Sequence, residues 1–231
     1  MLLEYFFAFL WIVLALNVAY MLIFAIAGLF YPKEHYPIVD RKFKFAIFIP
    51  AYKGDEVILH TAQHTLKQNY PKDKFEVIVI ADSLRAETLQ TFSKLPVRVV
   101  EVHFENSTKG KSINAALEAV KGEKYDYAVI LDIDNLVEAN FLEKMNTTLQ
   151  KGQKVVQAHR LAKNNETKFS VLDGVSEEIN NHIFRKGHKV LGLSAALIGS
   201  GKAVKYEFFE EIMSKITAIG GFDKQMEVLI I

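Results

Sequence analysis

The sequence predicts an α/β domain with a mainly parallel β-sheet, preceded by one long apolar helix. Two observations predict this fold class. Residues 43–158 alternate short, β-branched apolar runs with amphipathic stretches, a pattern typical of strand–helix units in a parallel, doubly wound sheet. Residues 5–30 carry no charged side chain, which is typical of a helix that lies in a membrane or a core.

The apolar run at residues 5–30 is interrupted only by Asn17 and Gly28. About 20 apolar residues cross the hydrocarbon core of a bilayer, so the run is long enough to span with some tilt. A signal peptide is the alternative, because Ala25-Ile-Ala27 mimics a cleavage site. The run is longer than a signal-peptide core, however, and no Lys or Arg precedes it. We therefore expect a retained transmembrane helix over residues 1–31.

The charges that flank this helix predict its orientation. Only Glu4 lies on its N-terminal side, whereas the C-terminal side carries Lys33, Arg41, Lys42 and Lys44. The positive-inside rule then places everything after the helix in the cytoplasm. Residues 32–42 are expected to form a juxtamembrane linker.

The strands and helices of the domain are predicted in chain order from their hydrophobic periods. Each predicted strand is a short apolar run, at residues 43–50, 75–81, 98–103, 127–131 and 155–158. The helices between them are predicted at residues 55–69, 85–95, 111–120 and 138–150. Beyond residue 159 the alternation loosens, to a helix at 169–186, a strand at 193–198 and a helix at 206–215.

The predicted strand at residues 127–131 is followed at once by two acidic residues. In extended chain Asp132 and Asp134 point to the same side, about 7 Å apart, while Ile133 points the other way. Two such carboxylates can bind one hard divalent cation and leave positions open for phosphate oxygens. Ligands of open α/β sheets bind at the carboxyl ends of the strands, where these acids are expected. The alternative is that Asp132 caps a turn and Asp134 is solvated.

Polar residues also follow the other predicted strands. Pro50–Glu56 follows the first strand, Asp82 ends the second, and Lys109-Gly-Lys111 precedes a helix. Each is weak evidence alone, since aspartate suits a turn and lysines are commonly solvated. Together they predict carboxylates and cations along one edge of the sheet, which suits a nucleotide with metal-bound phosphates.

Composition and chain ends narrow the possibilities further. The formal net charge of +1 implies no general attraction to nucleic acid, so no nucleic-acid partner is expected. The chain has no cysteine, which excludes a disulfide framework and thiolate chemistry. It ends in mid-pattern on the apolar run Val228–Ile231, and an exposed apolar terminus is unusual. We expect a fragment of a longer protein; the alternative is a natural end packed into the core.

In their order and spacing, five motifs resemble the inverting glycosyltransferases of family 2, of the membrane-anchored bacterial type. The motifs are Ile49–Glu56, Val79–Asp82, Lys109–Leu117, Leu131–Asn135 and Gly199–Gly201. The resemblance implies a GT-A fold over residues 43–231, a Rossmann-like sheet flanked by helices. Its nucleotide-binding half would be residues 43–135, and its acceptor half, incomplete here, residues 136–231.

The resemblance also implies roles for the nucleotide-binding residues. The backbone of Pro50, Ala51 and Tyr52, together with Glu56, would hold the ribose and base of the donor. Asp82 would meet the edge of the base. Lys111 would face the nucleotide.

The remaining motifs would bind the diphosphate and the sugar. Asp132 and Asp134 would handle the diphosphate and its Mg²⁺ or Mn²⁺, because a metal neutralises the charge that develops on the leaving diphosphate. Gly199, Ser200 and Gly201 would let the backbone approach the sugar or acceptor closely. The alternative for these three residues is an ordinary tight turn.

The catalytic base falls where the sequence departs from the family. Members usually carry Glu-Asp near the start of a late helix, and the Asp deprotonates the acceptor. Here Asp223 occupies the aspartate position, but Phe222 replaces the glutamate, and Glu227 lies one turn later on the same helical face. We expect Asp223 to be the base, with Glu227 as the substitute; the alternative makes Asp223 only a helix N-cap. A Gln-x-x-Arg-Trp element of processive members is absent from this chain.

These observations predict a metal-dependent glycosyltransferase at the cytoplasmic face of the inner membrane, single-pass in this chain. It would transfer a sugar with inversion from a nucleotide-sugar, such as a UDP-sugar, to a saccharide or lipid-linked acceptor in polysaccharide biosynthesis. Two alternatives stay open. A nucleotidyltransferase also uses metal-binding carboxylates, although Ala51–Gly54 is a poor version of its basic loop. A non-catalytic membrane scaffold on a degenerate transferase fold is the other.

Overall fold

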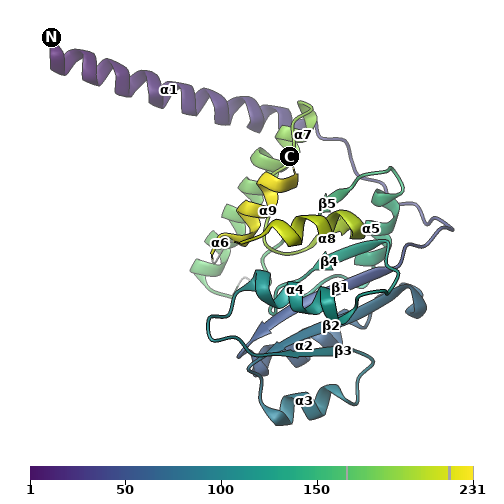
Figure 1. Ribbon diagram of the computed structural model, residues 1–231. Helices are drawn as coiled ribbons and strands as arrows, with labels where there is room; N and C mark the ends of the chain where they lie inside the picture. The colour runs from purple at the N-terminus through teal and green to yellow at the C-terminus, as the bar shows by residue number, and fades with distance from the viewer. Residues whose placement is uncertain (165, 218–219, 231) are drawn as a thin grey trace. The chain divides into compact units, whose positions relative to one another are not determined.

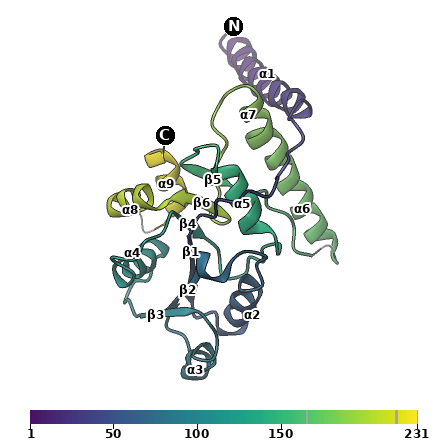
Figure 2. The same ribbon diagram turned by 90° about the vertical axis from the view of Figure 1, so that its right-hand side faces the viewer.

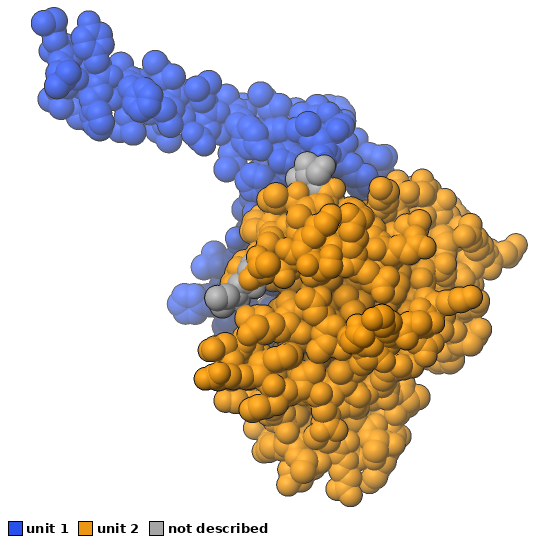
Figure 3. Space-filling view, in the orientation of Figure 1, with its two compact units in different colours: residues 1–34, 159–196 blue, residues 35–158, 197–231 orange. Residues whose placement is uncertain are grey.

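The structure is a computed structural model that describes residues 1–164, 166–217 and 220–230 (Figure 1). It divides into two compact units, coloured in Figure 3. Unit 1 comprises Met1–Glu34 and His159–Ala196, and unit 2 comprises His35–Ala158 and Leu197–Ile231. Ile231, the last residue of the apolar terminus, lies outside the described residues.

Unit 2 is built on a six-stranded sheet with the strand order β3-β2-β1-β4-β6-β5. Four neighbouring strands are parallel: β3 (Arg98–Val102), β2 (Phe75–Asp82), β1 (Phe45–Tyr52) and β4 (Tyr127–Ile130). β6 (Lys202–Lys205) runs antiparallel to both β4 and β5 (Val155–Gln157). The predicted α/β fold with a mainly parallel sheet is confirmed.

The central strands are buried on both faces, which explains why their sequences read as continuous apolar runs. Successive side chains of a strand point to opposite faces, and β1 divides accordingly. Phe45, Ile47 and Ile49 enter one hydrophobic cluster, whereas Ala46 and Phe48 enter a second cluster. All five side chains are fully buried.

Helices cover both faces of the sheet (Figure 2). The first cluster is completed by α2 (Asp55–Thr65), α3 (Ala86–Phe92) and α5 (Phe141–Leu149). The second is completed by α4 (Lys109–Ala119), α8 (Tyr206–Lys215) and α9 (Phe222–Ile230). A short 3₁₀ turn, η1 (Lys72–Lys74), precedes β2. The α4–α8–α9 layer matters most for the site, because α4 and α9 both begin at the carboxyl edge of the sheet.

Unit 1 contains α1 (Leu2–Leu29) and a continuous helical segment of α6 (Lys168–Asn180), η2 (Asn181–Gly187) and α7 (His188–Val190). η2 is a π-helix. In length and composition α1 is able to cross a membrane, and only 6% of its most apolar window is buried. The helix predicted at residues 169–186 is therefore present, with a change to π-helical winding near its end.

One predicted strand is wrong. Residues 193–198 are irregular, and the strand that completes the sheet is β6, further along the chain. The N–H of Leu197 donates to Glu227 Oε1 at 3.1 Å, and the N–H of Ile198 donates to Gln157 Oε1 at 3.1 Å. Side-chain acceptors thus satisfy this apolar run in place of a neighbouring strand. Apolar period alone does not distinguish the two cases.

Candidate active site

The topology places the site at the carboxyl ends of β1 and β4. From β1 the chain steps outward to β2 and β3, and then returns to place β4 on the other side of β1. That reversal is a topological switch point, where open α/β sheets bind their ligands. Tyr52 at the end of β1 pairs with Asp82 at the end of β2. Since strands lie about 4.8 Å apart, Asp82 and the residues after β4 are about 10 Å apart across the sheet.

The turns after β1 and β2 are both held in left-handed backbone conformations. Lys53 has φ +49° and Ser83 has φ +58°, which are uncommon values for residues other than glycine. The N–H of Lys53 donates to the carbonyl of Asp82 at 3.1 Å, so one turn supports the other. Such local strain is concentrated at functional sites of proteins.

Asp82 is buried, and its carboxylate is already engaged. It accepts hydrogen bonds from Ser83 Oγ at 3.0 Å and from Ser107 Oγ. Ser83 also contacts His103 Nδ1 at 3.1 Å, beside a groove of about 280 Å³ at the ends of β2 and β3. Asp82 therefore organises the turns around this groove.

The other residues predicted to hold the ribose and base lie at the end of β1 and the start of α2. Pro50 and Ala51 are within β1, and Ala51 is buried. Tyr52 is 56% exposed, and the Lys53 ammonium lies 5.1 Å from its ring centroid. Glu56, in the first turn of α2, is exposed.

Asp132 and Asp134 lie on a turn, not on extended chain, because β4 ends at Ile130. The N–H of Asn135 donates to the Asp132 carbonyl at 3.1 Å and closes this turn. Ile133 packs into the core as expected, against Gly54, where an added Cβ would lie 2.0 Å from Ile133 Cδ1. Asp134 is exposed, and its carboxylate accepts only a local bond from the Asn135 side chain, at 2.9 Å, among the contacts of the described residues.

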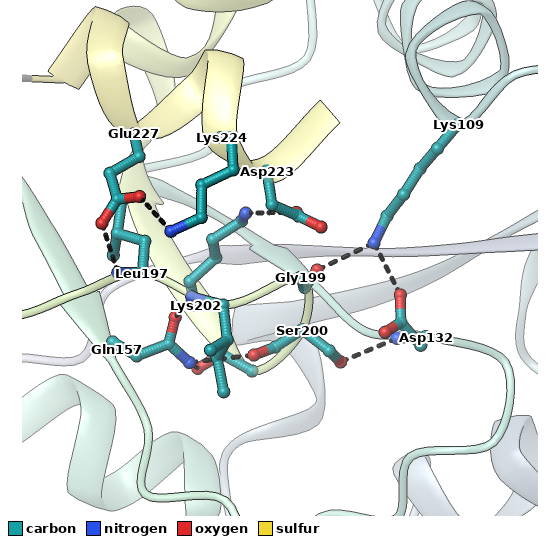
Figure 4. Close-up of polar contacts among 12 residues, drawn as sticks. Lys109, Asp132, Gln157, Leu197, Gly199, Ser200, Lys202, Asp223, Lys224 and Glu227 are labelled. Atoms are coloured by element: carbon teal, nitrogen blue, oxygen red, sulfur yellow. Dashed lines mark hydrogen bonds and ion pairs between the residues drawn. The ribbon is translucent and has the colours of Figure 1, made fainter. Parts of the chain in front are cut away.

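Lys109 is the cation that meets Asp132 (Figure 4). Its Nζ donates to Asp132 Oδ1 at 2.6 Å and to the carbonyl of Gly199 at 2.8 Å. Lys111, the predicted nucleotide ligand, donates instead to the carbonyl of Asn106 at 2.8 Å. The reason is the start of α4, which begins at Lys109 with Thr108 as its N-cap, two residues earlier than predicted. The Lys109-Gly-Lys111 motif contained the signal for Lys109, which is the lysine of this motif that contacts Asp132.

The Gly199–Gly201 loop is fixed against the same turn. Ser200 Oγ accepts the N–H of Asp132 at 2.8 Å, and Gln157 Nε2 donates to the Ser200 carbonyl at 2.9 Å. Gly201 has φ +71°, a conformation that L side chains rarely adopt. The loop therefore joins the acidic turn on one side to β6 on the other.

Asp223, at the start of α9, forms an ion pair with Lys202 of β6 at 2.9 Å (Figure 4). The side chain of Lys202 is 0% exposed, whereas that of Asp223 is 34% exposed. Burial lowers the pKa of Lys202, and the adjacent Asp223 carboxylate opposes that shift. A Cβ added to Gly199 would lie 2.7 Å from Asp223 Oδ2, so the loop backbone touches this carboxylate. The sequence pattern gave little reason to single out Lys202. β6 contains two lysines, of which only Lys202 is buried, whereas Lys205 is exposed.

Phe222, which replaces the family's glutamate, is buried between two lysines. Its ring centroid lies 5.4 Å from Lys202 Nζ and 5.5 Å from Lys109 Nζ. A cation over an aromatic face is attracted by the ring quadrupole. Phe222 therefore supports both cations without adding a charge that would compete with Asp132 or Asp223.

Glu227, one turn further along α9, is engaged by its surroundings. It accepts the N–H of Leu197 at 3.1 Å and the Lys224 ammonium at 2.8 Å, and its side chain is 19% exposed. Burial alone raises the pKa of Glu227, but the hydrogen bonds from Lys224 and Leu197 lower it overall. Glu227 thus fixes the irregular chain that leads into the Gly199–Gly201 loop.

The sheet order and solved structures of similar shape define the class of protein, a GT-A fold. The mannosyltransferase PcManGT of Pyrobaculum calidifontis, in complex with GDP-Man and Mn²⁺, matches with a TM-score of 0.60 at 15% identity, over 85% of this chain and 55% of that one. TarS residues 1–349 of S. aureus in complex with UDP match with a TM-score of 0.59 at 18% identity, over 80% of this chain and 54% of that one.

The chain belongs to the family described as glycosyltransferase like family 2, whose pattern matches residues 42–229. The poly(ribitol-phosphate) beta-N-acetylglucosaminyltransferase TarS of Staphylococcus aureus is 29% identical over 104 residues, 43% of this chain and 18% of that protein. Glycosyltransferase GlyG of Streptococcus pneumoniae is 24% identical over 181 residues, 72% of this chain and 58% of that protein. The chain thus spans less than two thirds of the length of these relatives. The resemblance to family 2 is confirmed.

The acidic turn fits a divalent cation that is shared with a substrate. No cluster of three or more His, Cys, Asp or Glu residues suited to a metal occurs among the described residues. Mg²⁺ and similar ions in nucleotide sites commonly use only one or two carboxylates, and the substrate phosphates and waters complete the shell. Asp134, exposed and free of any ion pair within the described chain, together with Asp132, supplies that donor set.

Proposed function

We propose that the protein is an inverting glycosyltransferase that takes a nucleotide-sugar donor. One observation carries the proposal: the acidic turn, the Gly199–Gly201 loop and Asp223 converge on one side of the switch point, linked by Lys109 and Lys202. Inverting transfer requires a diphosphate site and an acceptor base that face the same sugar. The convergence supplies candidates for both.

The diphosphate side of the site is the acidic turn with Lys109. Asp134 and Asp132 would hold Mg²⁺ or Mn²⁺, which neutralises charge on a leaving diphosphate. Lys109 is close enough to Asp132 to move from the carboxylate to a phosphate oxygen when donor binds. Neighbours of this fold contain UDP, UDP-GlcNAc or GDP-Man, which supports a nucleotide-sugar donor. We favour a UDP-sugar.

The acceptor side of the site is the start of α9. Asp223 presents one oxygen to Lys202 and the other to the backbone of Gly199. It is partly exposed, so an acceptor hydroxyl can reach it, and it would remove that hydroxyl's proton as the glycosidic bond forms. Glu227, whose oxygens are both engaged, would position the loop.

We further propose that α1 anchors the protein in the inner membrane, with unit 2 in the cytoplasm. The length and apolar composition of α1 and the basic residues that follow it support this placement. A saccharide or lipid-linked acceptor would then be used at the cytoplasmic face.

Incubating the chain with a panel of nucleotide-sugars and Mn²⁺, while nucleotide release is measured, tests the activity. We expect one donor to release nucleotide, in the presence of acceptor, above the background measured without acceptor. Asp223→Asn should abolish this release. Binding of UDP without release in the presence of any saccharide or lipid-linked acceptor favours the non-catalytic scaffold. Release of pyrophosphate from a nucleoside triphosphate favours a nucleotidyltransferase.

A further inference from the structure

Helix α6 in unit 1 carries an exposed apolar stripe. None of its residues is buried, and Phe169, Leu172, Val175 and Ile179 are 85%, 65%, 51% and 50% exposed. Their spacing of three, three and four residues places them on one face of a helix. Exposed apolar surface of this kind marks an interaction site.

The stripe continues onto η2 and reaches α1. Ile183, four residues after Ile179, lines a groove of about 450 Å³ with the α1 residues Asn17, Val18, Met21, Leu22 and Ala25. The amide of Asn17 donates to the carbonyl of Val13 at 2.8 Å within its own helix. The groove is otherwise apolar, so the stripe on α6 and the apolar surface of α1 form one continuous face.

The opposite face of the same segment carries paired charges. Arg185 contacts Glu177 at 3.0 Å, and Glu178 contacts His159 at 2.7 Å. Asn181 is buried and donates to the carbonyl of Arg160 at 2.9 Å. The segment is therefore amphipathic, with its polar side paired inside unit 1 through these contacts.

Close contacts attach η2 to the C-terminal third of α1. A Cβ on Gly187 would lie 2.2 Å from the Phe24 carbonyl oxygen, and one on Gly28 would lie 2.8 Å from the His182 ring. His182 Nε2 lies 2.8 Å from the Ala25 carbonyl oxygen. Figure 1 shows α6 running across the axis of α1. A helix that crosses the end of a spanning helix in this way would lie along the bilayer surface.

The length of α1 agrees with this arrangement. Its part before Tyr20 is about 27 Å long at 1.5 Å per residue, close to the thickness of about 30 Å of a hydrocarbon core. The helix contacts η2 and α7, and Tyr20 Oη meets His188 Nε2 at 2.9 Å. The span thus ends where the crossing segment begins.

We propose that α6 and η2 form an interfacial helix in the surface of the bilayer, with the stripe Phe169–Leu172–Val175–Ile179–Ile183 directed at the acyl chains. The groove beside Ile183 takes the end of an acyl chain. Interfacial amphipathic helices bury their apolar face about 5–10 Å into the headgroup boundary. The proposal rests on the membrane placement of α1 and not on the sugar-transfer chemistry.

Spin labels test this directly, because the chain has no native cysteine to remove. Single variants Leu172→Cys, Ile179→Cys and Ile183→Cys are labelled in the full chain, reconstituted in phospholipid vesicles. We expect collisions with oxygen and protection from a water-soluble nickel complex. Glu178→Cys, on the polar face, is the matched control and should be open to the nickel complex. Leu10→Cys, within the span, reports whether α1 is in the bilayer.

Each outcome separates the hypotheses. A lipid-like signal at Leu10 with nickel-accessible labels at Leu172 and Ile179 overturns the interfacial helix alone. A water-exposed label at Leu10 overturns the membrane placement and the interfacial helix with it. Labels at Leu172 and Ile179 that broaden one another, and sharpen on dilution with unlabelled chain, show that a second copy covers the stripe, which also overturns the proposal.

Discussion

The Lys202–Asp223 pair predicts opposite consequences for removal of its two members. Asp223→Asn leaves the fully buried Lys202 ammonium without a carboxylate, whereas Lys202→Met leaves a carboxylate that is 34% exposed and can be hydrated. Methionine also has a volume similar to that of lysine and needs no hydrogen bond. The first substitution should destabilise the protein, and the second should be nearly neutral.

The magnitude follows from the burial of each group. Removing one partner of a fully buried pair costs about 3–5 kcal/mol, and replacing such pairs by apolar residues is often neutral or stabilising. Because Asp223 is partly exposed, we expect about 1–3 kcal/mol for Asp223→Asn and under about 1 kcal/mol for Lys202→Met. The double variant Asp223→Asn/Lys202→Met should regain most of the stability lost in Asp223→Asn.

Activity separates folding from chemistry in the same variants. A general base contributes roughly 10²–10⁴ in rate, so Asp223→Asn should lose turnover by that factor while donor binding stays nearly intact. The double variant should recover stability but not turnover. Chemical denaturation of the full chain in detergent gives the first quantity, and nucleotide release gives the second.

Two results would refute this reasoning. Strictly additive free energies of unfolding in the double variant would show that the two side chains are not coupled. Turnover above about a tenth of wild type in Asp223→Asn, or its recovery in the double variant, would show that Asp223 is not the base.

Three further predictions concern the surrounding residues. Asp134→Asn should abolish the effect of Mn²⁺ on UDP binding, measured by calorimetry with Mn²⁺ and with chelator; equal affinities in wild type under both conditions would exclude a metal site. Gly199→Ala should lower turnover with little change in donor binding, because its Cβ meets the Asp223 carboxylate, whereas Gly220→Ala, whose Cβ meets none of the described residues within 4 Å, serves as the control. Glu227→Gln should reduce the loss of unfolding free energy at acid pH. The lowered pKa of Glu227 contributes stability above about pH 4.5, and this stability is lost as the pH falls through the folded-state pKa. An unchanged dependence of the unfolding free energy on pH would contradict the structural role of Glu227.

The sheet was predictable from the sequence because its central strands are buried on both faces and read as uninterrupted apolar runs. The strand predicted at residues 193–198 is wrong for a related reason. In sequence, an apolar run whose N–H groups bond the side chains of Gln157 and Glu227 cannot be distinguished from the apolar run of a buried strand. β6 was not predicted because its two lysines, one of them buried, mask its apolar character.

Asp82, Asp132 and Asp134 could be singled out in the sequence because they end or closely follow buried apolar strands. The cations were harder to predict, because their positions depend on tertiary contacts. The N-cap at Thr108 decides that Lys109 faces Asp132, and the packing of α9 against β6 decides that Lys202 meets Asp223. The local pattern of the chain does not show which acid each lysine meets.

The pairing of β5 with β6 has a consequence for how the chain assembles. The two strands form an antiparallel hairpin, and the N–H of Ala158 bonds the carbonyl of Gly201 at 2.8 Å where the strands meet. Its connecting loop includes all of His159–Ala196. Closing a loop of roughly 40 residues in place of a short turn costs only about 2 kcal/mol in chain entropy. An insertion of this length therefore adds little to the entropic cost of folding the sheet, and a short linker that joins Ala158 to Leu197 would remove the unit 1 part of the loop while keeping Gly199–Gly201.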